Sequence, residues 1–270
     1  MSKQVPGYKT ADQSKKESVE QDSASSLARG LSVLECFGQE KRNRYTLSEL
    51  ARRLDMPKST MYRVLKTLSR MGYLRYEEHS KHYYLGVRVL SLGFALLEGM
   101  ELREIARPYM EMLSHECNKT VNLTILDGME MVYVERVSVR SIRVYNIGVG
   151  SRIQPWDSAV GKAVLAFLDA PTVSQMIKKA RKGGIFKSKE DIFMKDLIDV
   201  RENGFAENNQ ESRAGIIAIA APVFSSKGVM GAINLIAEPE EFSIDVLKER
   251  YAPKLMKISK ELSEALGYRG

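Results

Sequence analysis

Apolar residues recur at helical spacing in three stretches near the start of the chain, at 25–37, 46–54 and 58–71. The first stretch follows serines that can cap a helix, and Gly38 ends it. The second begins with a capping-box pattern, in which Thr46 is followed three residues later by Glu49. Pro57 separates the second from the third, which stops before Gly72. The pattern predicts three helices, the last two joined by a tight turn.

Two short runs rich in aromatic and apolar residues follow, at 73–76 and 82–85, around a polar turn at 77–81. Such runs indicate a β-hairpin. Three helices followed by a hairpin predict a winged helix-turn-helix over residues 25–86. A further helical pattern, from residue 87 to about 103, is interpreted as a linker helix with a dimer contact, and residues 87–104 are assigned to it.

The pattern becomes mixed from residue 105 to residue 270. Strands are predicted at 121–126, 131–136, 142–147, 216–224 and 230–237. Helices are predicted at 110–118, 159–168, 173–181, 189–202 and 244–266. Asp127 and Gly128 form a hairpin turn signal between the first two strands. Antiparallel strands flanked by helices predict an α+β sensor domain of the GAF or PAS type.

The composition fits a soluble globular chain of about two domains, with 44% hydrophobic and 28% charged residues. The chain lacks an apolar run of about 18 residues and the apolar core of a signal peptide, so we expect a cytoplasmic protein. Residues 1–24 are polar and of mixed charge, and are expected to form a disordered tail. Cys36 and Cys117 are the only cysteines, and no structural disulfide is expected.

The net charge of +7 is concentrated in the segment that resembles a DNA reader. Residues 25–86 hold 12 Lys and Arg against 6 Asp and Glu, whereas the tail carries 4 of each sign. Binding to the phosphate backbone needs positive charge at the contact surface. The distribution therefore favours a DNA-binding protein over one with a generally basic surface.

The third predicted helix supplies most of the candidate DNA contacts. Arg63 is the best candidate for a base contact, because a guanidinium can grip a guanine edge with two hydrogen bonds. Lys58, Ser59 and Lys66 are expected to hold phosphates. In the wing, Lys81 and His82 are within reach of the backbone or the minor groove. The full set of predicted DNA contacts is Arg44, Lys58, Ser59, Thr60, Tyr62, Arg63, Lys66 and Lys81.

Six segments together resemble the isocitrate lyase regulator (IclR) family of bacterial transcription factors. They are residues 26–34, 47–54, 57–65, 72–86, 158–166 and 215–224, and the resemblance covers about residues 25–268. The resemblance implies a cytoplasmic repressor or activator that binds a pseudo-palindromic operator as a dimer, often paired into a tetramer. It also implies a GAF-like C-terminal domain that binds a small organic acid from a catabolic pathway. Repression is favoured, although operator position decides the sign of regulation.

The same resemblance implies an effector pocket. Its expected residues are Ser158, Ala159, Val160, Asn208, Ala218, Asn234 and Ile236. Where the family's best-known member carries Asp, Cys, Ser and Ser, the last four positions here are less acidic and more apolar. A larger acid with an apolar or ring portion, or a sugar-derived acid read by the two amides, is therefore expected. Met129, Met131 and Trp156 are candidates for the apolar side, or are plain core.

The residues at 157–161 have two compatible interpretations. The start of a helix suits a carboxylate, because its backbone N–H groups and its dipole favour an anion. Alternatively, Asp157 or Ser158 serves only as the N-cap of that helix.

Three other functions make different demands on the sequence. An enzyme is not expected, because His79, His82 and His115 do not suggest a metal cluster and Ser158 lacks a nucleophile-elbow setting. No cofactor and no metal are expected. A constitutive architectural DNA binder would not need a sensor domain of this size. An adaptor whose C-terminal domain binds another protein stays open on the sequence alone.

Overall fold

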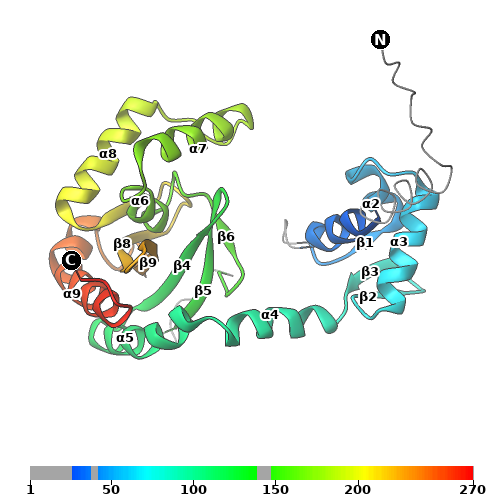
Figure 1. Ribbon diagram of the computed structural model, residues 1–270, viewed down its shortest axis with the longest axis horizontal. Helices are drawn as coiled ribbons and strands as arrows, with labels where there is room; N and C mark the ends of the chain where they lie inside the picture. Colours follow the sequence, from blue (N-terminus) through cyan, green and yellow to red (C-terminus); the bar gives the residue numbers. More distant parts are fainter. Residues whose placement is uncertain (1–25, 38–41, 139–146, 270) are drawn as a thin grey trace, which may run out of the picture. The chain divides into compact units, whose positions relative to one another are not determined.

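The computed structural model describes residues 26–37, 42–138 and 147–269. The described residues form two compact units that divide between Leu96 and Leu97. Figure 1 shows the helices and strands of each unit.

The N-terminal unit is the winged helix-turn-helix that the pattern predicted. A helix at residues 26–36 precedes β1 (Tyr45–Thr46), α2 (Leu47–Arg53), α3 (Lys58–Arg70), β2 (Leu74–Glu77) and β3 (His82–Leu85). The three strands form an antiparallel sheet in the order β1-β3-β2. Leu50, Met61 and Leu65 are fully buried at its centre. The two-residue strand β1 was not predicted, because two residues are too few to show an alternating pattern. Gly38, the predicted end of the first helix, lies outside the described residues.

A close approach of two chain segments ties the wing to the end of α3. A Cβ atom built on Gly86 would lie 2.1 Å from the carbonyl oxygen of Gly72. Gly72 itself has φ +79°, in the left-handed region that glycine adopts without strain. Both positions therefore need glycine, one for space and the other for its backbone conformation.

The single helix predicted over 87–103 is wrong, because the chain forms two helices there. These are α4 (Arg88–Glu98), which buries none of its residues, and α5 (Glu101–Cys117). The helix expected at 110–118 is the second half of α5, which contains Pro108. Leu102, Ala106 and Met110 are buried on one face of α5, and this packing outweighs the backbone hydrogen bond that proline removes.

The C-terminal unit contains one six-stranded antiparallel sheet in the order β6-β5-β4-β9-β8-β7. Its strands are β4 (Thr120–Asp127), β5 (Glu130–Val137), β6 (Arg152–Ile153), β7 (Ala206–Asn209), β8 (Ile217–Ser225) and β9 (Gly228–Ala237). Its remaining helices are α6 (Ala159–Leu165), α7 (Ala170–Lys182), α8 (Glu190–Asn203) and α9 (Ile244–Ala265). The α+β fold class is thus confirmed. The edge strands β6 and β7 were not predicted, and α6 ends three residues before its predicted end at residue 168. The strand predicted at 142–147 lies outside the described residues except for its last residue.

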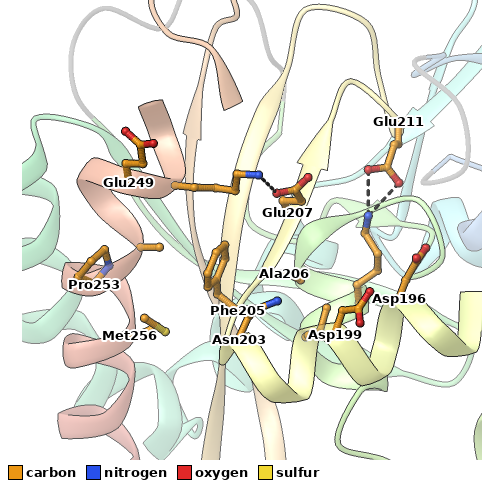
Figure 2. A pocket seen from close by; sticks show the side chains of 14 residues that line it. Asp196, Asp199, Asn203, Phe205, Ala206, Glu207, Glu211, Glu249, Pro253 and Met256 are labelled. Atoms are coloured by element: carbon orange, nitrogen blue, oxygen red, sulfur yellow. Dashed lines mark hydrogen bonds and ion pairs between the residues drawn. The ribbon is translucent and has the colours of Figure 1, made fainter. Parts of the chain in front are cut away.

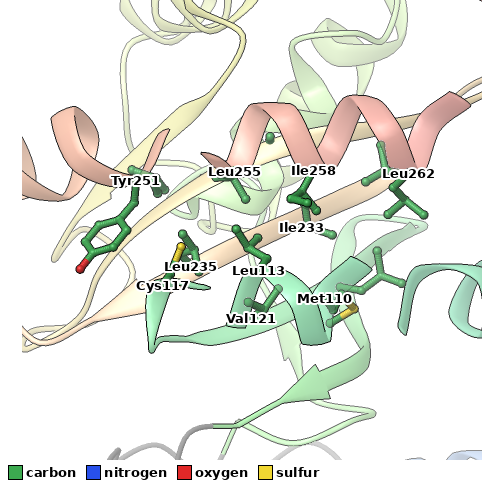
Figure 3. Packing of buried hydrophobic residues seen from close by; sticks show 14 of the residues in the cluster. Met110, Leu113, Cys117, Val121, Ile233, Leu235, Tyr251, Leu255, Ile258 and Leu262 are labelled. Carbon is green, nitrogen blue, oxygen red and sulfur yellow. The ribbon is translucent and has the colours of Figure 1, made fainter. Parts of the chain in front are cut away.

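Alternating side chains divide this unit into two cores. Ile217, Ile219 and Val223 belong to the core between the sheet, α5 and α9. Figure 3 shows Leu113 of α5 and Leu255 of α9 in this core. Ala218 and Ala220 face the other way, toward α6. These small side chains let α6 lie close to the sheet, and a Cβ atom on Gly161 would come within 2.2 Å of Pro155. None of the helices in the described ranges is long and apolar enough to span a membrane.

Candidate DNA-binding face and effector site

The α3 helix has one buried face and one face that carries donors. Met61, Leu65 and Leu68 are buried against the rest of the unit. On the opposite face, Lys58, Ser59, Tyr62, Arg63 and Lys66 are exposed, whereas Thr60 is half-buried. Five of the six DNA-contact residues predicted on α3 therefore have exposed side chains.

The tip of the wing is held by hydrogen bonds to one carboxylate. Glu77 accepts hydrogen bonds from Ser80 Oγ at 2.5 Å and from the Tyr84 hydroxyl at 3.0 Å. These bonds, led by that from Ser80, hold the pKa of Glu77 below its usual value. Lys81 is exposed at the turn with φ +56°. The wing therefore presents its lysine from a defined turn.

The start of α2 carries the predicted capping box. Thr46 Oγ1 accepts from the Glu49 backbone N–H at 3.3 Å, and Glu49 Oε2 accepts from the Thr46 backbone N–H at 2.7 Å. Arg42 lies 2.5 Å from Glu49 Oε1. The bond from the Thr46 backbone, followed by the contacts of Arg42, lowers the pKa of Glu49 to about 2. Arg44, the predicted phosphate contact, is exposed beside this cap.

The predicted effector residues are brought together on the α6 side of the sheet. Asn208, Ala218 and Ile236 are register neighbours on β7, β8 and β9. Asn234 lies on the same face of β9, one pleat away from Ile236. All seven predicted residues, including the three at the start of α6, are at most 5% exposed. Four separate segments of the chain, the start of α6 and the strands β7, β8 and β9, therefore meet in one buried place.

Two of these residues already have partners within the protein. Ser158 Oγ accepts from the Gly161 backbone N–H at 3.2 Å and donates to the carbonyl of Gln154 at 2.8 Å. Ser158 is thus the N-cap of the seven-residue helix α6, as one of the two interpretations expected. Asn208 donates to the carbonyl of Asp157 and accepts from Ser212 at 3.5 Å. Both side chains fix the approach of the chain to α6.

Asn122 is a buried polar residue of this face that the sequence reasoning missed. It is fully buried on β4, and its Nδ2 donates to Asn234 Oδ1 at 2.8 Å. Val121 and Leu123 on either side of it point into the opposite core. The available signal was an amide residue in the middle of an otherwise apolar strand.

The aromatic and sulfur candidates belong to the core. Trp156 and Met131 are at most 3% exposed within the cluster around α6, and Met129 packs partly buried against it. Trp156 makes an edge-on contact with Phe186, with ring centroids 5.5 Å apart. These residues close the apolar side of the α6 layer.

A separate groove of about 740 Å³ lies between α8, β7 and α9. Two ion pairs flank it (Figure 2): Lys162 with Glu211 at 2.8 Å, and Lys248 with Glu207 at 2.8 Å. None of the seven predicted effector residues lines this groove. The predicted site and this open groove are therefore different places in the unit.

A winged helix-turn-helix joined to an α+β domain with a buried polar site defines the class of DNA-binding regulators. A family model for the IclR helix-turn-helix domain matches residues 26–78, and one for the bacterial transcriptional regulator IclR C-terminal domain matches residues 94–264. The chain belongs to the IclR family of bacterial transcriptional regulators.

Known proteins resemble the chain over most of its length. The HTH-type transcriptional regulator KdgR of Escherichia coli (strain K12) is 32% identical over 254 residues, which cover 92% of this chain and 94% of KdgR. The Pca regulon regulatory protein of Pseudomonas putida is 28% identical, covering 91% of this chain and 85% of its own. The crystal structure of a transcriptional regulator from Rhodococcus sp. RHA1 gives a TM-score of 0.74 at 31% identity, covering 90% of this chain and 98% of its own. These relatives are transcriptional regulators rather than enzymes.

Proposed function

We propose that this chain regulates a catabolic operon from the cytoplasm by binding a pseudo-palindromic operator as a dimer, with its DNA affinity controlled by a small organic acid. The acid binds between α6 and the sheet, beside Ser158, Ala159, Val160, Asn208, Ala218, Asn234 and Ile236. Repression is the favoured mode, and pairing of dimers into tetramers follows the family resemblance.

The exposed face of α3 is the observation that carries the proposal. Lys58, Arg63 and Lys66 stand on the solvent side of a helix whose opposite side is anchored by fully buried residues. A helix with this division fits the major groove and presents its donors to base edges and phosphates. The proposed contacts on this unit are Arg44, Lys58, Ser59, Thr60, Tyr62, Arg63, Lys66 and Lys81.

The α4 helix supports the dimer. Leu90, Leu92, Phe94 and Leu96 are between 53% and 65% exposed, although each is large and apolar. Leu90 and Phe94, four residues apart, share one side of the helix, and exposed apolar surface of this kind favours association. A second copy of the same helix offers a matching surface, since two-fold dimers use the same patch on both subunits.

The buried polar face under α6 supports a small effector. Ligand sites are mostly apolar and hold a few precisely placed polar groups, and here amides stand among Ala218, Ile236 and Val160. Among the described residues, no group of three or more His, Cys, Asp or Glu side chains could hold a metal ion. The name of the Pca regulon regulatory protein, a relative over most of the chain, supports the assignment to a catabolic regulon.

Capture of genomic DNA tests the proposal. The purified chain is incubated with sheared DNA of its host, and the bound fragments are sequenced. We expect a few sharp peaks that share an inverted repeat. The variant Arg63→Ala is the matched control and should lose these peaks while keeping weak general binding. Diffuse recovery that vanishes at moderate salt would contradict a sequence-specific regulator.

The genes beside the peaks give the candidates for the effector. Their organic-acid substrates and products are titrated against the protein on its operator fragment. We expect at least one of these acids to change operator affinity by about fivefold or more. Operator binding that none of them alters would contradict control by a small acid from the regulated pathway.

A further inference from the structure

Two asparagine side chains on the α6 side of the sheet are hydrogen-bonded to each other. Each keeps one polar atom that has no partner among the described residues. Asn122 and Asn234 are at most 3% exposed, and Asn122 Nδ2 donates a hydrogen bond to Asn234 Oδ1 at 2.8 Å. The remaining oxygen, Asn122 Oδ1, is buried and accepts no hydrogen bond from any described residue. The remaining nitrogen, Asn234 Nδ2, likewise donates to no described residue. The pair therefore offers one acceptor, Asn122 Oδ1, and one donor, Asn234 Nδ2, on two hydrogen-bonded side chains.

A cation lies next to this pair, and no acidic side chain among the described residues pairs with it. Arg136 on β5 is opposite Asn122 in the ladder, and Asn122 is in turn opposite Asn234. Register neighbours point to the same face of a sheet, with Cβ atoms roughly 5 Å apart. Arg136 is half-buried, donating to Ser138 Oγ at 2.9 Å and to the carbonyl of Ile147 at 2.6 Å.

No described carboxylate forms an ion pair with this guanidinium, and its burial lowers its pKa. A half-buried charge without a counter-ion is unfavourable, as is a buried amide oxygen without a donor. Arg136, Asn122 and Asn234 form a row across β5, β4 and β9. Both costs disappear if one ligand brings an anion and a hydrogen-bond donor to this row.

We propose that this row selects a hydroxylated organic acid. The effector carboxylate binds Arg136, its hydroxyl hydrogen is donated to Asn122 Oδ1, and its hydroxyl oxygen accepts from Asn234 Nδ2. This inference rests on the proposed small-acid effector and narrows its chemical class. A second carboxylate in place of the hydroxyl has acceptors only, so it leaves Asn122 Oδ1 without a donor.

Matched sets of acids test the inference on the full chain by titration calorimetry. One set is 4-hydroxybenzoate, benzoate and terephthalate, and the other is 6-hydroxyhexanoate, hexanoate and adipate. In at least one set we expect the hydroxylated member to bind about tenfold or more tightly than the other two.

Two substitutions separate the roles within the row. Asn122→Leu should abolish the preference for the hydroxyl while leaving the affinity for the unhydroxylated acid nearly unchanged. Arg136→Gln should weaken every acid about tenfold and keep the hydroxyl preference.

Thermal unfolding without ligand separates binding from a purely structural role. Asn122→Leu removes the unsatisfied oxygen of Asn122 together with the donor to Asn234 Oδ1, so it should lower the melting temperature less than Asn234→Leu does. Asn234→Leu should lower the melting temperature, because it leaves both ends of the Asn122 amide without partners. A larger loss of stability in Asn122→Leu than in Asn234→Leu would instead make Asn122 a structural residue and overturn the inference.

The outcomes distinguish this inference from the function on which it rests. Equal affinity for hydroxylated and unhydroxylated acids would overturn the inference and leave the small-acid effector standing. Absence of binding by all six acids at millimolar concentration would contradict the small-acid effector itself, and this inference with it. Operator capture, which needs no effector, would still report on DNA binding in that case.

Discussion

Ser158 and Asn208 sit at the predicted effector site but already have their hydrogen bonds satisfied by the protein. Two residues that the sequence did not suggest differ from them. Asn122 Oδ1 accepts no hydrogen bond from a described residue, and Arg136 forms no ion pair with a described carboxylate. The difference lies in geometry that residue type does not reveal, since Asn208 and Asn122 are chemically identical. At the scale of single residues, free hydrogen-bonding capacity is the better guide to a binding role.

Arg63 is the residue on which DNA specificity is expected to depend most. Arg63→Ala should weaken operator binding by roughly 1–3 kcal/mol and relax base preference, because a two-pronged base contact is lost. Arg63→Lys keeps the charge without the fork, so it should keep most of the salt dependence and lose base discrimination. Electrophoretic mobility shifts with the operator and single-base variants measure both. Unchanged affinity in both variants would remove Arg63 from the contact set.

Gly161 is the residue on which the packing of α6 is expected to depend. Gly161→Ala places a Cβ atom 2.2 Å from Pro155, so α6 must move off the chain segment before it. We expect a loss of about 1–3 kcal/mol in the free energy of unfolding, measured with urea. Gly148→Ala, in the same unit and with no atom within 4 Å of its Cβ, is the control. Equal unfolding midpoints in the two variants would contradict the close packing.

At the scale of elements, the sequence predicted those helices and strands that have a capping motif or a regular spacing of apolar residues. The capping box placed α2 to the residue, and alternation placed β4, β5, β8 and β9 within a few residues. The strands β1, β6 and β7 have two to four residues and exist because a neighbouring strand pairs with them. The boundary between α4 and α5 was missed because apolar residues recur at helical spacing both before and after it, so the pattern looks like one continuous helix.

The capping box predicts a defined pH dependence of stability. The pKa of Glu49 in the folded state is about 2, against an ordinary value of 4.5. Ionised Glu49 therefore stabilises the fold above pH 4.5, and this contribution is lost as the pH falls from 4.5 toward 2. Glu49→Gln should lower the free energy of unfolding by about 1 kcal/mol at neutral pH.

Chemical denaturation across pH measures this contribution. The difference between the native chain and Glu49→Gln should be constant above pH 4.5 and should shrink toward pH 2. Glu78→Gln, on the exposed wing turn, is the matched control and should change stability by less than about 0.5 kcal/mol. A difference that does not vary with pH would assign the effect of Glu49 to something other than its charge.

At the scale of the whole molecule, charge and apolar surface are distributed unevenly. The excess of positive charge lies in residues 25–86, where the winged helix-turn-helix is. The most exposed apolar helix, α4, comes directly after it in the chain. This order along the chain is consistent with the proposed dimer on a two-fold operator.

The exposed face of α4 predicts a dimer that substitution can weaken. Leu90→Ser combined with Phe94→Ser removes two apolar side chains that are 61% and 53% exposed. Analytical ultracentrifugation should show at least a dimer for the native chain. For the variant it should show a dissociation constant raised about tenfold or more. Met112→Ser, at a 49% exposed position on α5, should leave the mass unchanged. An unchanged mass in the double variant would place the dimer contact elsewhere.

The sequence by itself determined the DNA-binding unit and the class of protein. Its signals are local: caps, helical period, a hairpin and clustered positive charge each depend on residues near one another in the chain. Only the tertiary structure decided which polar groups of the effector domain stay free. Asn122, Arg136 and Asn234 come from three strands that are up to 112 residues apart in the chain. Their shared row exists only after β4 has paired with both β5 and β9, because strand register, and not sequence spacing, sets which side chains meet.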